Sequence, residues 1–281
     1  MTVKNYTILM MIGMNDIELM IIPDVHGRFF WKEPIKYIIE NTDKKIVFLG
    51  DYVDPYDDDF FNENNEPLYE NIGTINDMLK NTIKILKEII ALKKLYPDRI
   101  ILLLGNHDCS YMIGTEICKA RYDRYNCREI SNLFKENKDL FQLAYETTIN
   151  DKHIIFSHAG INKLYAYDCF GEENVNEHNV VSLFNDAFKN DNYGVIQSLG
   201  MYSFFRGFGG GSYGSLIWAD AREWYNASVR INRKNEPFCF SVVGHTQLKT
   251  HCIDNNIAFL DSRECFIIDK EGNIKKFEEI I

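Results

Sequence analysis

The 281-residue sequence predicts an α/β fold in which two β-sheets pack face to face with helices outside. Three observations support this fold class. Short runs of large aliphatic residues repeatedly end in aspartate, asparagine or histidine, as in residues 100–108 (IILLLGNHD), and such runs are typical of strands buried on both faces. Strands and amphipathic helices alternate early, whereas strands dominate late. No linker divides the sequence, so we expect a single domain over residues 1–281.

The first half alternates between strands and helices. Apolar runs predict strands at residues 17–23 and 45–49, and apolar residues within 29–40 recur with a helical period. Residues 73–96 have the pattern of an amphipathic helix, which Pro97 ends just before the central strand. These elements alternate as they do in parallel sheets covered by helices.

The second half is richer in strands. Residues 111–138 and 177–200 are expected to be helical, and alternating apolar residues over 141–149 predict a strand. A turn leads from that strand into the next one, at 153–157. The last strands are expected at 215–219, 238–243, 249–260 and, as a pair, within 264–277.

Three segments lie outside this pattern. Residues 1–16 are an N-terminal extension whose short apolar stretch indicates a leader or an extra strand. Residues 52–72 predict a long acidic loop, which is either a solvated surface loop or a rim that repels polyanions. Residues 201–214 contain five glycines and five aromatic residues, and predict a loop or a lid over substrate.

The composition restricts the classes of partner. A net charge of −10 argues against a dedicated nucleic-acid or anionic-membrane surface. The seven cysteines include no CxxC pair, which favours free thiols in a reducing cytoplasm. No apolar run approaches the ~20 residues of a membrane span. We therefore expect a cytoplasmic protein that is not bound to membranes or nucleic acid.

Polar side chains follow five of the predicted strands. Because the carboxyl ends of strands in α/β sheets are where chemistry is usually placed, these side chains are expected to converge. Carboxylates mixed with imidazoles suit Mn, Fe, Zn or similar divalent ions, and their number suits two ions bridged by one carboxylate. Each motif alone is more simply a turn or a loop cap, but five together favour a site. The candidate residues are Asp24, His26, Asp51, Asn106, His158 and His245.

These strand ends resemble, in order, the five motifs of the calcineurin-like metallophosphoesterases over about residues 17–265. Residues 50–54 (GDYVD) and 218–220 (WAD) also resemble the PPP-type phosphoprotein phosphatases. The resemblance implies a four-layer α/β/β/α sandwich of two mixed β-sheets flanked by helices. The five matching segments are 24–27 (DVHG), 50–54 (GDYVD), 105–108 (GNHD), 158–160 (HAG) and 244–246 (GHT).

The resemblance also implies roles for the matching positions. His107 would be the general acid that protonates the leaving group, oriented by Asp54, since a carboxylate fixes the tautomer of an imidazole. The implied metal ligands are Asp24 and His26 for the first ion, Asp51 as the bridge, and Asn106, His158 and His245 for the second ion.

Two positions depart from the family pattern. Gln247 stands where many phosphodiesterases of the superfamily have a second histidine, which leaves three protein ligands for the first metal, as in the PPP branch. Pro55 stands where PPP phosphatases have an arginine that clamps the substrate phosphate, and proline cannot replace a guanidinium. Arg206 and Arg222 are the candidates for a replacement, with Arg28 as a weaker third.

We therefore expect a metal-dependent phosphoesterase that hydrolyses phosphate monoesters by attack of metal-bound hydroxide. No Ser or Cys motif indicates a covalent nucleophile. The expected substrate is a phosphorylated molecule, plausibly a phosphoprotein, and the expected cofactors are two divalent ions, Mn²⁺ first, with Fe, Zn or Ni as alternatives. The competing hypotheses are a phosphodiesterase or nuclease, a dinucleoside-polyphosphate hydrolase, and a catalytically silent metal-binding scaffold. The oligomeric state stays open.

Overall fold

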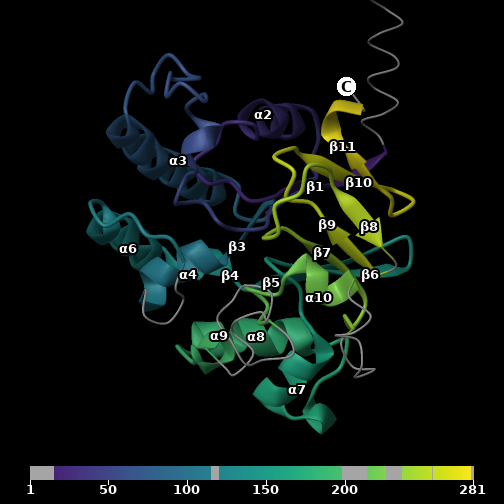
Figure 1. Ribbon diagram of the computed structural model, residues 1–281. Coiled ribbons are helices and arrows are strands. Elements are labelled where there is room, and N and C mark those ends of the chain that lie inside the picture. The colour runs from purple at the N-terminus through teal and green to yellow at the C-terminus, as the bar shows by residue number, and fades with distance from the viewer. Residues whose placement is uncertain (1–15, 115–119, 198–213, 226–235, 255, 280–281) are drawn as a thin grey trace, which may run out of the picture.

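The computed structural model describes residues 16–114, 120–197, 214–225, 236–254 and 256–279. Two mixed β-sheets form the centre, and helices flank them (Figure 1). The fold class predicted from the sequence is therefore confirmed. Within the described ranges, no helix is long and apolar enough to cross a membrane.

The first sheet has the strand order β11-β10-β1-β2-β3-β4. Strands β1 to β4 are parallel neighbours, whereas β10 and β11 run antiparallel at the other edge. Its strands are β1 (Ile17–Ile22), β2 (Lys45–Phe48), β3 (Ile100–Leu103), β4 (Phe141–Gln142), β10 (Phe266–Asp269) and β11 (Ile274–Lys276).

The second sheet has the order β5-β6-β7-β9-β8. Its three central strands are parallel, and an antiparallel strand closes each edge. Its strands are β5 (Ala144–Ile149), β6 (Lys152–Ser157), β7 (Phe240–Val243), β8 (Cys252–Asp254) and β9 (Ile257–Phe259).

The central strands are buried on both faces, which explains their nearly continuous apolar sequence. Alternate residues such as Leu19 and Val47 belong to one core that also contains Phe156 and Val242 of the second sheet. The intervening residues belong to a second core, shared with the helices. Each central strand therefore serves two packing surfaces.

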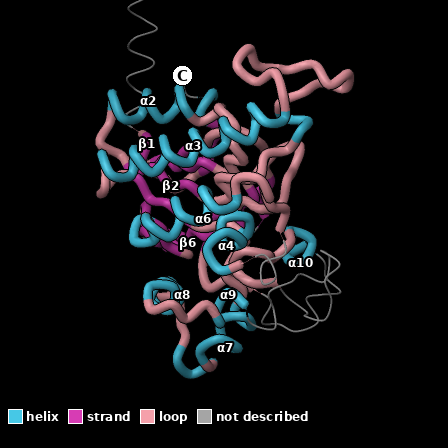
Figure 2. Tube along the Cα trace, turned by 90° about the vertical axis from the view of Figure 1, so that its left-hand side faces the viewer, coloured by secondary structure: helices cyan, strands magenta, loops and turns pink. Residues whose placement is uncertain are grey.

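Helices cover the sheets on the outside. Figure 2 shows α2, α3, α4 and α6 in front of the strands, and α7, α8 and α9 grouped below them. The helices are α2 (Lys32–Asn41), α3 (Ile75–Leu95), α4 (Asn106–Ile113), α6 (Cys127–Glu136), α7 (Lys163–Phe170), α8 (Val180–Lys189), α9 (Gly194–Gln197) and α10 (Ala221–Tyr225). Short 3₁₀ turns occur at Asp57–Asp59, Lys138–Leu140, Glu172–Asn174 and Phe277–Glu279.

Four predicted elements differ from the structure. The helix expected over 177–200 is divided into α8 and α9, and the strand expected at 249–260 is the antiparallel pair β8 and β9. The helix expected over 111–138 is interrupted, because residues 120–126 form an irregular segment between α4 and α6. The strand expected at 215–219 is a turn, in which the backbone N–H groups of Trp218 and Ala219 both donate to the carbonyl oxygen of Ser215, at 2.9 Å each. Leu216 is fully buried in that turn, so an apolar sequence there does not require a strand.

Candidate metal centre

The loops after the parallel strands are joined by backbone hydrogen bonds. The N–H groups of Val25 and His26 donate to the carbonyl oxygen of Asp51, at 3.1 and 2.7 Å. The imidazole Nδ1 of His158, at the end of β6, lies 2.9 Å from the carbonyl oxygen of Leu49, just after β2. The two sheets thus bring their carboxyl ends to one place, as the sequence predicts.

Asp51 lies at the centre of this convergence. Its Oδ2 is 3.6 Å from His26 Nε2 and 3.4 Å from His158 Nε2, while its Oδ1 accepts the backbone N–H of His107 at 2.9 Å. Two buried groups of ligand atoms, each within 4.8 Å, share this carboxylate: His26, Asp51 and His107 form one, and Asp51, His158 and His245 form the other. These donors fit a pair of cations bridged by Asp51.

The imidazoles are oriented by backbone carbonyl groups. His26 Nδ1 lies 2.8 Å from the carbonyl oxygen of Val53, and His158 Nδ1 is held by Leu49. Donation through Nδ1 leaves Nε2 of both rings free to face Asp51, which is the arrangement of metal-binding histidines. His158 Nε2 also lies 3.0 Å from Asn106 Oδ1 and 3.1 Å from His245 Nδ1.

Asp24 lies beside this centre but outside the two tight groups. Both of its carboxylate oxygens accept the backbone N–H of His245, at 3.0 and 3.1 Å. Asp24 can lie this close to the backbone before His245 only because residue 244 is a glycine, since a Cβ on Gly244 would stand 2.1 Å from Asp24 Oδ1. Gly105 has the same relation to Asp51 Oδ1, also at 2.1 Å. Glycine before Asn106 and His245 therefore makes room for the carboxylates.

Burial and mutual charge shift the pKa values of the centre. Burial raises the pKa of Asp24, with a further contribution from Asp51, to about 6. Burial lowers the pKa of His158, but Asp51 and Asp24 outweigh it and raise that pKa to about 10. Burial lowers the pKa of His26 well below its ordinary value. A bound cation must therefore displace the proton held by His158.

His107 forms a catalytic-type pair with Asp54. The imidazole Nδ1 of His107 lies 2.7 Å from Asp54 Oδ2, and both side chains are buried. The hydroxyl of Tyr111 donates to the other oxygen of Asp54 and accepts the backbone N–H of Asp123 at 2.7 Å. Both oxygens of Asp54 are thus engaged, which fixes the orientation of His107. Tyr111 is not among the candidate site residues named from the sequence.

Four site residues have left-handed backbone conformations. The φ angles are 44° at His26, 51° at Asp51, 59° at Asp54 and 64° at His245. Such conformations are uncommon for residues other than glycine and persist only where surrounding contacts hold them. Asp108 supplies such contacts at Asp51, because its carboxylate accepts the N–H groups of Asp51, Tyr52 and Gly105 at 2.7–2.9 Å.

The arginines predicted to bind phosphate have different surroundings. Arg222 forms an ion pair with Asp220, with Nε 2.8 Å from Oδ1, at an exposed position. Arg28 is buried, and its Nε donates to Asp59 Oδ2 at 2.6 Å. Arg206 lies outside the described residues.

Arg121 was missed by the sequence reasoning and lies beside the departure from the family pattern. Its guanidinium donates to the carbonyl oxygens of Asp54, at 2.7 Å, and Pro55, at 3.0 Å. The guanidinium carbon lies 3.6 Å from the ring centroid of Tyr56, whose ring in turn meets that of His26 edge-on at 4.9 Å. No sequence motif marks Arg121, so only the structure identifies it.

Comparisons with known proteins agree with this geometry. The family model of calcineurin-like phosphoesterases matches residues 17–247. Among solved structures, the chain is similar to a cold-active protein-tyrosine phosphatase of a psychrophilic Shewanella, with 14% identity, a TM-score of 0.52, and coverage of 93% of this chain and 80% of that chain. A protein serine/threonine phosphatase from Saccharomyces cerevisiae aligns with 13% identity, a TM-score of 0.49, and coverage of 99% and 90%. The likeness to the Shewanella structure shows a shared fold.

Proposed function

This chain belongs to the calcineurin-like phosphoesterase family, and we propose that it uses two divalent ions to hydrolyse phosphate monoesters. The observation that carries the proposal is the sharing of Asp51 by two buried ligand groups. One carboxylate between two sets of imidazoles matches the requirement of a two-ion site, in which a bridging ligand keeps the ions ~3.5–4 Å apart. A scaffold without activity would not need His107 and Asp54 beside that site.

The ligands that we propose follow the family pattern. Bound ions would supply an activated water near neutral pH and would polarise the phosphoryl oxygens. We propose Mn²⁺ as the first choice, with Fe, Zn or Ni as alternatives, because carboxylate and imidazole donors suit all of these. The proposed ligands are Asp24, His26 and Asp51 for the first ion, and Asp51, Asn106, His158 and His245 for the second.

His107 is the proposed general acid. Asp54 holds Nδ1, so that Nε2 is the atom able to donate a proton to the leaving-group oxygen. His107 also belongs to one of the two ligand groups, so it would lie beside a cation held there, as a proton donor to a metal-bound substrate must. Tyr111 supports the pair by binding the second oxygen of Asp54.

Arg121 is the proposed cationic contact for the phosphate. It reaches the carbonyl oxygens of Asp54 and Pro55 from another part of the chain, and its guanidinium keeps further N–H donors beyond these two bonds. The preferred substrate is a phosphoprotein, consistent with the phosphatases among the structural neighbours. A phosphodiester substrate is the alternative, which Pro55 favours because the usual arginine is absent there. A cytoplasmic location remains a prediction.

A rate comparison tests the proposal. With Mn²⁺ added, the turnover of 4-nitrophenyl phosphate should far exceed that of bis(4-nitrophenyl) phosphate. Equal or greater turnover of the bis-ester would contradict the monoesterase proposal and support a phosphodiesterase instead. No turnover of either ester with both ions bound would favour the silent scaffold.

A further inference from the structure

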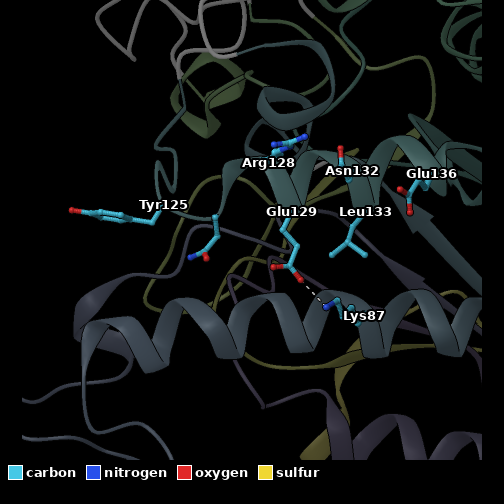
Figure 3. Close-up of a pocket in the computed structure, with 8 residues that line it drawn as sticks. Lys87, Tyr125, Arg128, Glu129, Asn132, Leu133 and Glu136 are labelled. Atoms are coloured by element: carbon cyan, nitrogen blue, oxygen red, sulfur yellow. Dashed lines mark hydrogen bonds and ion pairs between the residues drawn. The ribbon is translucent and has the colours of Figure 1, made fainter.

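Two cavities share Tyr125 as a lining residue, and one of them is also lined by Asp54 of the proposed catalytic pair His107–Asp54. One has a volume of about 600 Å³ and reaches Asp54 and Pro55. The other has a volume of about 440 Å³ and lies between α3 and α6 (Figure 3). We call the two together the Tyr125 groove; its charged lining includes Arg124 and Arg128.

The groove is physically linked to the catalytic pair. The carboxylate of Asp123 accepts the backbone N–H groups of Tyr125 and Asn126, at 2.9 and 3.0 Å. The backbone N–H of Asp123 donates to the hydroxyl of Tyr111, which donates to Asp54. The loop that presents Tyr125 is therefore connected, through Asp123 and Tyr111, to the Asp54 carboxylate that orients the proposed acid.

An aromatic side chain marks the junction of the two cavities. Tyr125 is 91% exposed, and Ile75, which lines the larger cavity, is 56% exposed. Figure 3 shows Tyr125 projecting away from α6. Tyrosine is enriched among residues that dominate binding, because its ring buries a large area at a low entropic cost. This exposure suits contact with a partner chain.

The charges of the groove differ from those of the whole chain. The chain carries a net charge of −10, yet Arg124 and Arg128 lie in the groove and form no ion pair within the described residues. Lys87 and Glu129 neutralise each other at 2.7 Å, as the dashed line in Figure 3 shows. Glu136 lies at the end remote from Tyr125 (Figure 3).

The larger cavity is also lined by Asp57 and Asp123, but the Asp123 carboxylate is buried and accepts the N–H groups of Tyr125 and Asn126. The exposed charged residues of this cavity are Asp57, Arg121 and Arg124, so the two guanidinium groups outnumber the exposed carboxylate and suit anionic groups.

We propose that the Tyr125 groove binds the polypeptide that flanks the phosphorylated residue of a protein substrate, with acidic side chains of that polypeptide meeting Arg124 and Arg128. This inference rests on the proposed phosphatase function and specifies its substrate class. Helix α6 has 10 residues and is about 15 Å long, a length that about five residues of an extended peptide span. A small phosphoester, held at the ions, would leave the groove empty.

The test compares two substrates of the Mn²⁺-loaded protein. One is a phosphopeptide of about ten residues with acidic residues beside the phosphorylated one, and the other is 4-nitrophenyl phosphate. The variants are Tyr125→Ala and the double variant Arg124→Glu/Arg128→Glu. Lys189→Glu, on α8 with a 71% exposed side chain, is the matched charge control. Each groove variant should lower kcat/KM for the peptide about tenfold through KM, and leave the small ester within about twofold.

The outcomes separate the two proposals. An unchanged ratio of peptide to small-ester turnover in both groove variants would overturn the groove, whatever the absolute rates. If the wild-type protein hydrolyses neither substrate, the phosphatase function fails instead. Fluorescence anisotropy of the labelled phosphopeptide then still tests the groove, since weaker binding by the variants supports it and equal binding overturns it.

Discussion

Replacing His107 by asparagine separates a general acid from a metal ligand. The substitution removes the proton donor but leaves the backbone N–H that donates to Asp51 Oδ1. General acids of this kind contribute ~10²–10⁴-fold, or about 2.7–5.4 kcal/mol of transition-state stabilisation. We therefore expect kcat to fall by that factor while both ions stay bound.

The dependence of the rate loss on the leaving group shows whether His107 acts as the general acid. An acid matters most when the leaving oxygen is strongly basic, so the loss should be largest for phenyl phosphate or phosphoserine and smaller for 4-nitrophenyl phosphate. Steady-state kinetics on both aryl esters gives the ratio, and elemental analysis gives the metal content of the same samples.

Asp54→Asn and Tyr111→Phe are controls that weaken the support of His107 to different degrees. Tyr111→Phe removes one of the two hydrogen bonds to the Asp54 carboxylate and should lower kcat about 10- to 100-fold, since a hydrogen bond to a charged group is worth ~1.5–3 kcal/mol. Loss of an ion from His107→Asn would refute the reasoning and make His107 a ligand. An equal loss of rate for both aryl esters would refute its role as the acid.

Five further predictions concern the ions, the stability of the metal-free protein and the phosphate. Asp51→Asn should weaken the binding of both ions, because we propose that this carboxylate bridges them. Elemental analysis gives the metal content, and one ion retained as in the wild-type protein would contradict the bridging role. Because the pKa of His158 is raised to about 10, this imidazole is protonated at pH 8, and ion binding should release about one proton. Calorimetry in two buffers of different ionisation enthalpy measures the number of protons released. The absence of proton release would contradict the raised pKa. The raised pKa of His158 also stabilises the metal-free protein. This stabilisation is complete below the ordinary histidine pKa of ~6.5 and is lost as pH rises through about 10. The free energy of unfolding, measured by urea titration, should therefore fall between these pH values, and a constant free energy would contradict the shift. Gly244→Ala should reduce ion affinity, because its methyl group would displace Asp24, and unchanged affinity would show that the carboxylate can move. Arg121→Gln should raise KM for a monoester about tenfold with the metal content unchanged, and an unchanged KM would remove Arg121 from the phosphate site.

Local sequence predicted the centre because its chemistry lies in short motifs at strand ends. Asp51, His158 and His245 each follow an apolar run and a glycine or serine. Their convergence follows from the general arrangement of α/β sheets, without knowledge of the exact pairing. The long helix, expected over 73–96 and found at Ile75–Leu95, was predicted because burial and period are local signals. The two mixed sheets, in contrast, were implied by the family resemblance.

The features of the site that the sequence did not predict depend on contacts between residues that are distant in the sequence. Asp108 was quoted within its motif, but its hydrogen bonds to the N–H groups of Asp51 and Tyr52 join segments more than fifty residues apart. Arg121 belongs to the segment that was expected to continue a helix. Its bonds to the carbonyl oxygens after β2 depend on that segment being irregular. A periodic pattern carries no information about such pairings.

Metal titration of the metal-free protein tests the two-ion site most directly. We expect two Mn²⁺ to bind per chain, and hydrolysis of 4-nitrophenyl phosphate to rise with occupancy of the second ion. Binding of a single ion at full activity, or two bound ions with no hydrolysis of any phosphoester, would contradict this expectation.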